Sequence, residues 1–90
     1  MAGALHTEEY RSVVEGLVVA RKAAGLSQAA LASQLGRPPS YVAKIELCER
    51  RLDVVETCQI ALAVSLDPFD FLRNRLSHMS APSKSSNPTP

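Results

Sequence analysis

Gly36 and the Pro38-Pro39 pair divide the middle of the chain into two short segments with helical spacing of apolar residues. A glycine allows the chain to reverse without a Cβ clash, and Pro39 suits the first turn of a helix. We therefore predict helices over 28–35 and 39–47. Two short helices joined by a glycine-containing turn are typical of a helix-turn-helix motif.

Further helices are predicted from residues that start and stop helices. Thr7, Asp53 and Asp67 each carry an oxygen that can cap a first turn, and Glu56 completes a capping box with Asp53. Gly25 is placed to end the first helix. The expected helices run over 7–24, from 53 to about 64, and from 67 to about 76. The predicted fold class is a compact all-α domain of five helices.

The candidate core is aliphatic, because aromatic residues make up only 4% of the chain and hydrophobic residues 46%. Positions three or four apart on each helix define the stripe that should be buried. Ala32 is expected to be a small residue at the crossing of the second and third helices. The other residues expected to be buried are Tyr10, Val13, Val14, Leu17, Leu26, Leu31, Leu35, Val42, Ile45, Val55, Cys58 or alternatively Val54, Ile60, Ala61, Val64, Phe69 and Leu72.

The 90 residues are enough for one small domain. The segment after Leu76 is rich in serine and proline and lacks leucine, valine, isoleucine and aromatic residues, so it cannot offset the entropy of ordering. We expect a folded domain over 7–76, a flexible N-terminus over 1–6 and a disordered tail over 77–90.

Several function classes are not expected from this sequence. No apolar run approaches the roughly 20 residues of a membrane span, and the first residues lack the apolar centre of a signal peptide. Cys48 and Cys58 are too sparse for a zinc site or a disulfide scaffold. There is no nucleophile–base pair or phosphate-cradling glycine loop. We expect a cytoplasmic protein that is not an enzyme and has no cofactor, metal or small-molecule ligand.

Charge is unevenly distributed although the net charge is only +1. Residues 21–51 carry six basic and two acidic side chains, and residues 53–72 carry four acidic and no basic ones. Such asymmetry favours one face that meets phosphate, although two ordinary solvated faces would have the same composition.

The stretch AGLSQAALASQLGRPPSYVAKIE, followed by ERRLDVVETCQIALAVSLDP, resembles the phage repressor and Cro type of helix-turn-helix regulator, the XRE-like family. The resemblance covers about residues 10–76. It implies a domain whose third helix enters the major groove of double-stranded DNA, usually as a homodimer on a palindromic operator. The expected function is a sequence-specific transcriptional regulator, a repressor or a controller.

The resemblance also implies roles for individual residues. The exposed part of the third helix faces base edges, the residues around it contact phosphates, and one ion pair ties the first helix to the third. The base-reading candidates are Ser40, Tyr41 and Lys44, with packing of Tyr41 against Pro38 and Pro39 as the alternative for that residue. The phosphate-binding candidates are Ser27, Gln28, Arg37, Arg50 and Arg51. The structural ion pair is Arg21 with Glu46.

Three positions depart from the family pattern in the turns. Pro38 stands where relatives carry a serine or threonine cap, so another group must satisfy the free N–H groups of the third helix. Cys48 and Ser65 stand where relatives commonly have glycine. Either these two residues adopt left-handed backbone at some cost, or their helices end differently.

Leu47 and Leu62 stand where relatives are usually polar. With Phe71 and Leu76 they could form an exposed apolar patch, and such patches mark partner surfaces. Leu62, Phe71 and Leu76 are the candidate contacts of a homodimer. An alternative is a protein-binding adaptor on a helix-turn-helix scaffold that no longer binds DNA, which the unusual Leu47, Cys48 and Pro38 favour.

Overall fold

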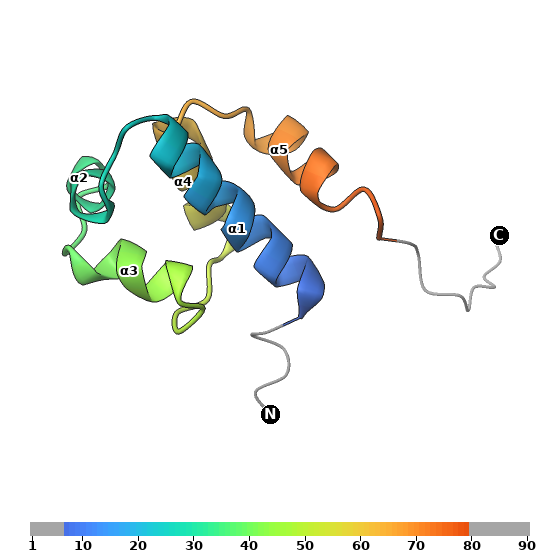
Figure 1. Ribbon diagram of the computed structural model, residues 1–90, viewed down its shortest axis with the longest axis horizontal. Coiled ribbons are helices and arrows are strands. Elements are labelled where there is room, and N and C mark those ends of the chain that lie inside the picture. The colour runs from blue at the N-terminus through green and yellow to red at the C-terminus, as the bar shows by residue number, and fades with distance from the viewer. Residues whose placement is uncertain (1–6, 80–90) are drawn as a thin grey trace, which may run out of the picture.

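The computed structural model describes residues 7–79 as helices and connecting segments, with no strand in that range (Figure 1). The five helices confirm the predicted all-α fold. The predicted flexible N-terminus, 1–6, and the predicted tail, 77–90, except for its first three residues, lie outside the described residues. No helix within 7–79 is long and apolar enough to span a bilayer. The helices are α1 (Glu8–Ala23), α2 (Gln28–Gln34), α3 (Ser40–Glu46), α4 (Val54–Ala63) and α5 (Pro68–Arg75).

Four of the helices begin at a residue whose side chain caps the first turn. Thr7 caps α1, Ser27 caps α2, and Asp67 caps α5 just before Pro68. Asp53 forms the predicted capping box of α4, since its carboxylate accepts from the backbone N–H three residues on at 2.7 Å. The first turn of α3 has no side-chain cap, because a proline precedes it. These starts follow from local chemistry, which is why the sequence predicts them.

Each of the first four helices is followed by a residue with left-handed backbone. Gly25 and Gly36 have φ of 75° and 70°. Cys48 and Ser65 have φ of 59° and 67°, so they adopt the glycine-like conformation rather than ending their helices differently. A side chain in this region costs about 1 to 2 kcal/mol.

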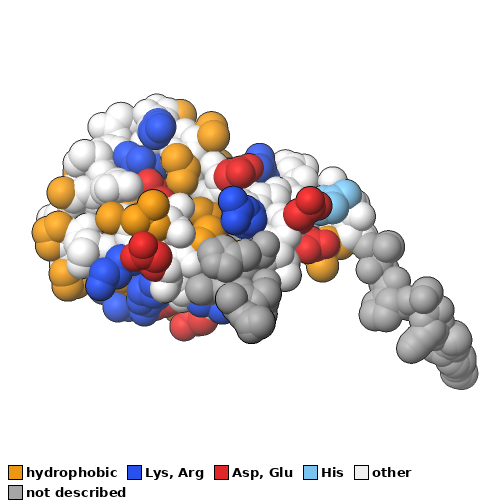
Figure 2. Space-filling view, turned by 60° about the horizontal axis from the view of Figure 1, so that its bottom comes forward, with side chains coloured by type: hydrophobic (Ala, Val, Ile, Leu, Met, Phe, Trp, Pro, Cys, Tyr) orange, Lys and Arg blue, Asp and Glu red, His pale blue; other side chains and the backbone are white. Residues whose placement is uncertain are grey.

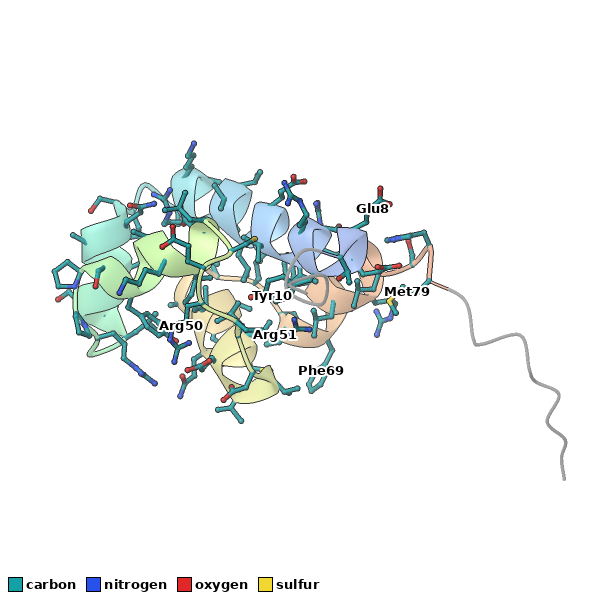
Figure 3. The ribbon with its side chains drawn as sticks, turned by 90° about the horizontal axis from the view of Figure 1, so that it is seen from below. Glu8, Tyr10, Arg50, Arg51, Phe69 and Met79 are labelled. Carbon is teal, nitrogen blue, oxygen red and sulfur yellow. The ribbon has the colours of Figure 1, made fainter. Side chains whose placement is uncertain are left out.

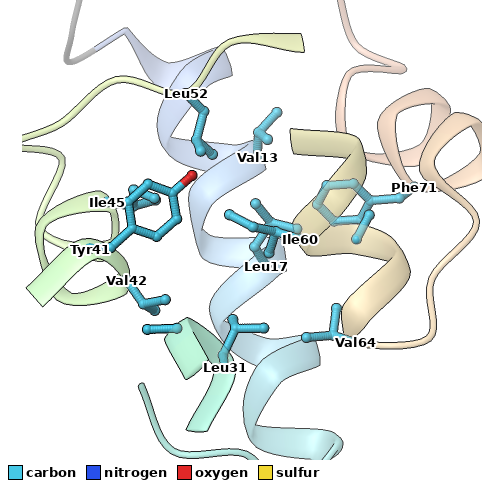
Figure 4. Packing of buried hydrophobic residues seen from close by; sticks show 12 residues of the cluster. Val13, Leu17, Leu31, Tyr41, Val42, Ile45, Leu52, Ile60, Val64 and Phe71 are labelled. Carbon is cyan, nitrogen blue, oxygen red and sulfur yellow. The ribbon is translucent and has the colours of Figure 1, made fainter. Parts of the chain in front are cut away.

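Aliphatic side chains from all five helices meet in one core (Figure 4). Ala32 is fully buried, as expected for a small residue where α2 packs against α3, and Ala61 on α4 is fully buried as well. Leu52, in the segment between α3 and α4, joins the core although the sequence does not single it out. The buried hydrophobic residues of the cluster are Val13, Leu17, Leu31, Ala32, Tyr41, Val42, Ile45, Leu52, Ile60, Ala61, Val64 and Phe71.

Two residues predicted to be buried are exposed. Val55 is exposed because α4 is turned so that Glu56 and Thr57 face inward instead. Phe69 is 74% exposed and points away from the helices (Figure 3). Phe71, about 200° further round α5, fills the core in its place.

The helices α1 and α5 touch at Gly16, which is buried. A Cβ atom built on Gly16 would lie 2.6 Å from Cε1 of Phe71 and 2.9 Å from Nε of Arg75. The Arg75 side chain is itself fixed, because its Nε donates to the Ser12 carbonyl at 2.9 Å. The absence of a side chain at Gly16 therefore sets how closely α5 can lie against α1.

Candidate nucleic-acid interface

The outward face of α3 is narrow and is formed by residues three, four and seven apart. Ser40, Lys44 and Leu47 are exposed and Ala43 is half-buried. At about 100° per residue these four positions share one arc of the helix. Val42 and Ile45 occupy the opposite side in the core, as predicted. We call Ser40, Ala43, Lys44 and Leu47 the α3 arc.

Tyr41, one of the predicted base-reading residues, is buried rather than exposed. Its side chain lies beside the α3 arc rather than on it, and the residue is only 7% exposed. Two guanidinium groups cover its ring, with the Cζ atoms of Arg37 and Arg50 at 4.7 and 4.8 Å from the ring centroid. The Tyr41 ring therefore presents little surface to solvent.

One edge of α3 is held by the buried ion pair of Arg21 and Glu46. Arg21 donates to the carboxylate through Nε at 2.6 Å and Nη2 at 3.1 Å, and its Nη1 donates to the Leu26 carbonyl at 2.8 Å. Gln28 donates from Nε2 to the same carboxylate at 2.7 Å. The predicted ion pair is therefore present, and it joins α1, α2 and α3 through one carboxylate.

The other edge of α3 is held by Glu56, a residue of α4. Arg50 donates to both carboxylate oxygens of Glu56, at 3.1 and 2.9 Å, and Nη2 of Arg37 lies 3.8 Å away. Glu56 also accepts from the backbone N–H of Asp53 at 3.1 Å. Two predicted phosphate-binding arginines thus share an internal carboxylate. The sequence shows Glu56 only as part of a capping box and gives no signal for this second role.

These contacts fix the protonation of Glu56. The hydrogen bonds from Arg50 and from the Asp53 N–H, with the charges of Arg50 and Arg37, lower the pKa of Glu56 to about 2 against the opposing effect of burial. Burial raises the pKa of Tyr41, and the Glu56 carboxylate raises it further. The Glu56 side chain is therefore an anion, and the Tyr41 hydroxyl is neutral, at neutral pH.

The low pKa of Glu56 makes folding depend on pH. A carboxyl whose pKa is lower in the folded state stabilises the protein above its unfolded value, 4.5, and loses that contribution as the pH falls towards 2. Urea unfolding between pH 5 and pH 2 should show a steeper loss of stability in the wild type than in Glu56→Gln. Glu49→Gln, which removes an exposed carboxylate nearby, is the control and should behave like the wild type. If the stability of wild type and of Glu56→Gln fell equally between pH 5 and pH 2, the low pKa assigned to Glu56 would be contradicted.

The segment between α3 and α4 is anchored to α1 by Tyr10. Its hydroxyl accepts from the backbone N–H of Leu52 at 3.0 Å and donates to the Arg50 carbonyl at 3.4 Å. The guanidinium of Arg51 lies over the Tyr10 ring, 5.0 Å from its centroid. Figure 3 shows Tyr10, Arg50 and Arg51 together along this segment. Sequence reasoning places Tyr10 in the core but does not find this contact.

The exposed apolar patch predicted for a dimer does not form as expected. Phe71 lies in the core, so it cannot form the predicted surface, and Leu76 is half-buried against the core. Leu62 is exposed beside a shallow groove of about 460 Å³ between α2 and α4. Leu47, the residue that follows α3, is also exposed. Figure 2 shows exposed apolar side chains and several basic ones over the end of the molecule that α2 and α3 form.

Two short helices packed through Ala32, joined at a left-handed Gly36 and tied to α1 by one ion pair, define a helix-turn-helix protein. A solved structure, the XRE-family like protein from Pseudomonas syringae pv. tomato str. DC3000, matches with a TM-score of 0.76 and 39% sequence identity. The match covers 80% of this chain and 88% of that one. No family model and no curated protein matches. The chain belongs to the XRE-like helix-turn-helix family, as the sequence predicts.

Proposed function

We propose that the chain is a sequence-specific DNA-binding regulator that places α3 in the major groove as a homodimer on a palindromic site. The observation that carries this proposal is the α3 arc. It is an exposed strip flanked by two carboxylate-centred clusters, one around Glu46 and one around Glu56. A rigid strip with a lysine, a hydroxyl and two apolar groups suits base edges, because lysine donates to guanine and apolar groups contact the thymine methyl.

Residues beside the α3 arc supply the phosphate contacts in this proposal. Ser27 and Gln28 lie at the start of α2, although the Ser27 hydroxyl already accepts from the Ala30 N–H and the Gln28 amide already donates to Glu46. Arg37 and Arg51 are exposed on the other side. Arg50 is also predicted for this role, but its guanidinium is already paired with the Glu56 carboxylate. Phosphate contacts of this kind fix register without reading sequence.

Binding should be tested first with duplexes selected from a random-sequence library. Lys44→Ala is expected to reduce the preference for the selected duplex over a scrambled one by about 1 to 3 kcal/mol, since a base contact is lost. Fluorescence anisotropy on both duplexes measures the change. Arg73→Ala, which removes a positive charge on α5, is the control and should retain the preference. If Lys44→Ala retained the full preference for the selected duplex, the proposed placement of α3 in the major groove would be contradicted.

The adaptor alternative rests on the exposed Leu47 and Leu62. It predicts that no duplex binds with steep salt dependence, because an apolar protein contact releases few counterions, whereas several phosphate contacts release many. The same anisotropy measurement between 50 and roughly 200 mM salt separates the two functions.

A further inference from the structure

The two carboxylate-centred clusters beside α3 differ in charge and exposure. Arg21 and Glu46 balance each other, and their side chains are 9% and 13% exposed. The other cluster has two guanidiniums, Arg37 and Arg50, for the one carboxylate of Glu56, which leaves one positive charge in excess. Its arginine side chains are 41% and 37% exposed, while that of Glu56 is 11% exposed. The carboxylate thus lies behind two guanidiniums that face solvent.

The two arginines do not share Glu56 equally. Arg50 donates to both carboxylate oxygens and, through Nη1, to the Arg51 carbonyl at 3.2 Å. Three of its five N–H groups are therefore engaged. Nη2 of Arg37 approaches the Glu56 carboxylate only to 3.8 Å, which is too long for a hydrogen bond. The planar guanidinium of Arg37 lies over the Tyr41 ring. A bidentate arginine–carboxylate pair uses the same geometry that would bind a phosphate.

We propose that Glu56 competes with DNA phosphate for Arg50 and thereby lowers the non-specific affinity of the surface around α3. This inference rests on the proposed DNA-binding function and assigns Glu56 as a residue that sets specificity without touching DNA. Arg37 binds phosphate, while Arg50 is held back by its internal partner. Non-specific binding is almost wholly electrostatic, so withholding one guanidinium weakens it more than it weakens base reading.

The proposal predicts unequal effects for the two arginines on non-specific duplex DNA. Each phosphate contact contributes about 0.9 to the slope of log affinity against log salt. Arg37→Ala should reduce that slope by about one, whereas Arg50→Ala should leave it unchanged. Equal reductions in the two variants would overturn the proposal. This comparison does not depend on any change at Glu56.

Removing the charge of Glu56 is the converse test. Glu56→Gln keeps a side chain that completes the capping box, so thermal unfolding should confirm that the variant folds. The slope on a scrambled duplex should steepen by about one and the affinity should rise several-fold, with a smaller rise on the selected duplex. Glu49→Gln removes an equal charge from the neighbouring segment without releasing an arginine, and its slope should match that of the wild type.

The double variant Glu56→Gln/Arg50→Ala decides the mechanism. If Glu56 acts through Arg50, the steeper slope disappears in the double variant. A gain that persists there, or that Glu49→Gln reproduces, shows a general charge effect and overturns the inference while DNA binding stands. Failure of the wild type to bind any duplex in a salt-dependent way overturns the proposed function itself.

Discussion

Glu46→Ala is expected to lower the free energy of unfolding by about 3 to 5 kcal/mol, because it leaves a charge buried without its partner. Arg21 is 7% exposed and donates twice to the Glu46 carboxylate. Gln28 loses its acceptor at the same time. Since a small domain has a total stability of about 5 to 15 kcal/mol, this one change removes a large fraction of it.

Urea unfolding followed by circular dichroism measures this loss. Asp70→Ala breaks the exposed pair of Asp70 and Arg73 and is the control, with an expected cost below about 1 kcal/mol. The double variant Arg21→Met/Glu46→Leu should regain most of the stability, because both charges then leave the interior together. A Glu46→Ala variant as stable as the control would show that solvent or another group compensates Arg21.

Gly16→Val is expected to cost about 3 kcal/mol, because its side chain would enter space that Phe71 and Arg75 occupy. Phe71 is buried and cannot swing into solvent, so α5 must shift away from α1. Gly16→Ala should cost about 1 to 2 kcal/mol, although alanine favours a helix over glycine by about 1 kcal/mol. A loss of stability in Gly16→Ala therefore indicates that close packing dominates, and a gain indicates that the helix preference of alanine dominates.

The matched control for Gly16 is Ala23→Val, at an exposed position of the same helix. It introduces the same β-branched side chain without a close neighbour and should cost only about 0.5 kcal/mol. Thermal unfolding of the three variants gives the comparison. An increase in stability for Gly16→Ala would mean that α5 moves without cost.

Features that depend on a few neighbouring residues could be predicted from the sequence. The cap at Asp53 and the turn at Gly36 each follow from local geometry, whereas the sequence leaves open whether Cys48 adopts left-handed backbone. The pairing of Arg21 with Glu46 could also be predicted, because the resemblance to a known family supplies a contact between distant positions.

Features that depend on three or more elements could not be predicted in this way. Tyr41 lies at the boundary between the exposed and buried sides of α3, so periodicity alone leaves its burial open. Its position is decided by Arg37 before the helix, Arg50 after it and Glu56 on α4, which meet only in the folded chain. The burial of Phe71 in place of the predicted Phe69 has a similar cause, since it depends on how α5 packs against α1 beside Gly16.

The side chains that hold α3 in position are different from those that it presents outward. Glu46 and Tyr41 face neighbouring helices, whereas Ser40, Lys44 and Leu47 touch little of their own protein. Descendants of this gene can therefore exchange the outward residues one at a time while inheriting an intact scaffold. If α3 reads DNA as proposed, exchanges at Ser40, Lys44 and Leu47 would change the preferred sequence at little cost in stability, because these side chains are exposed.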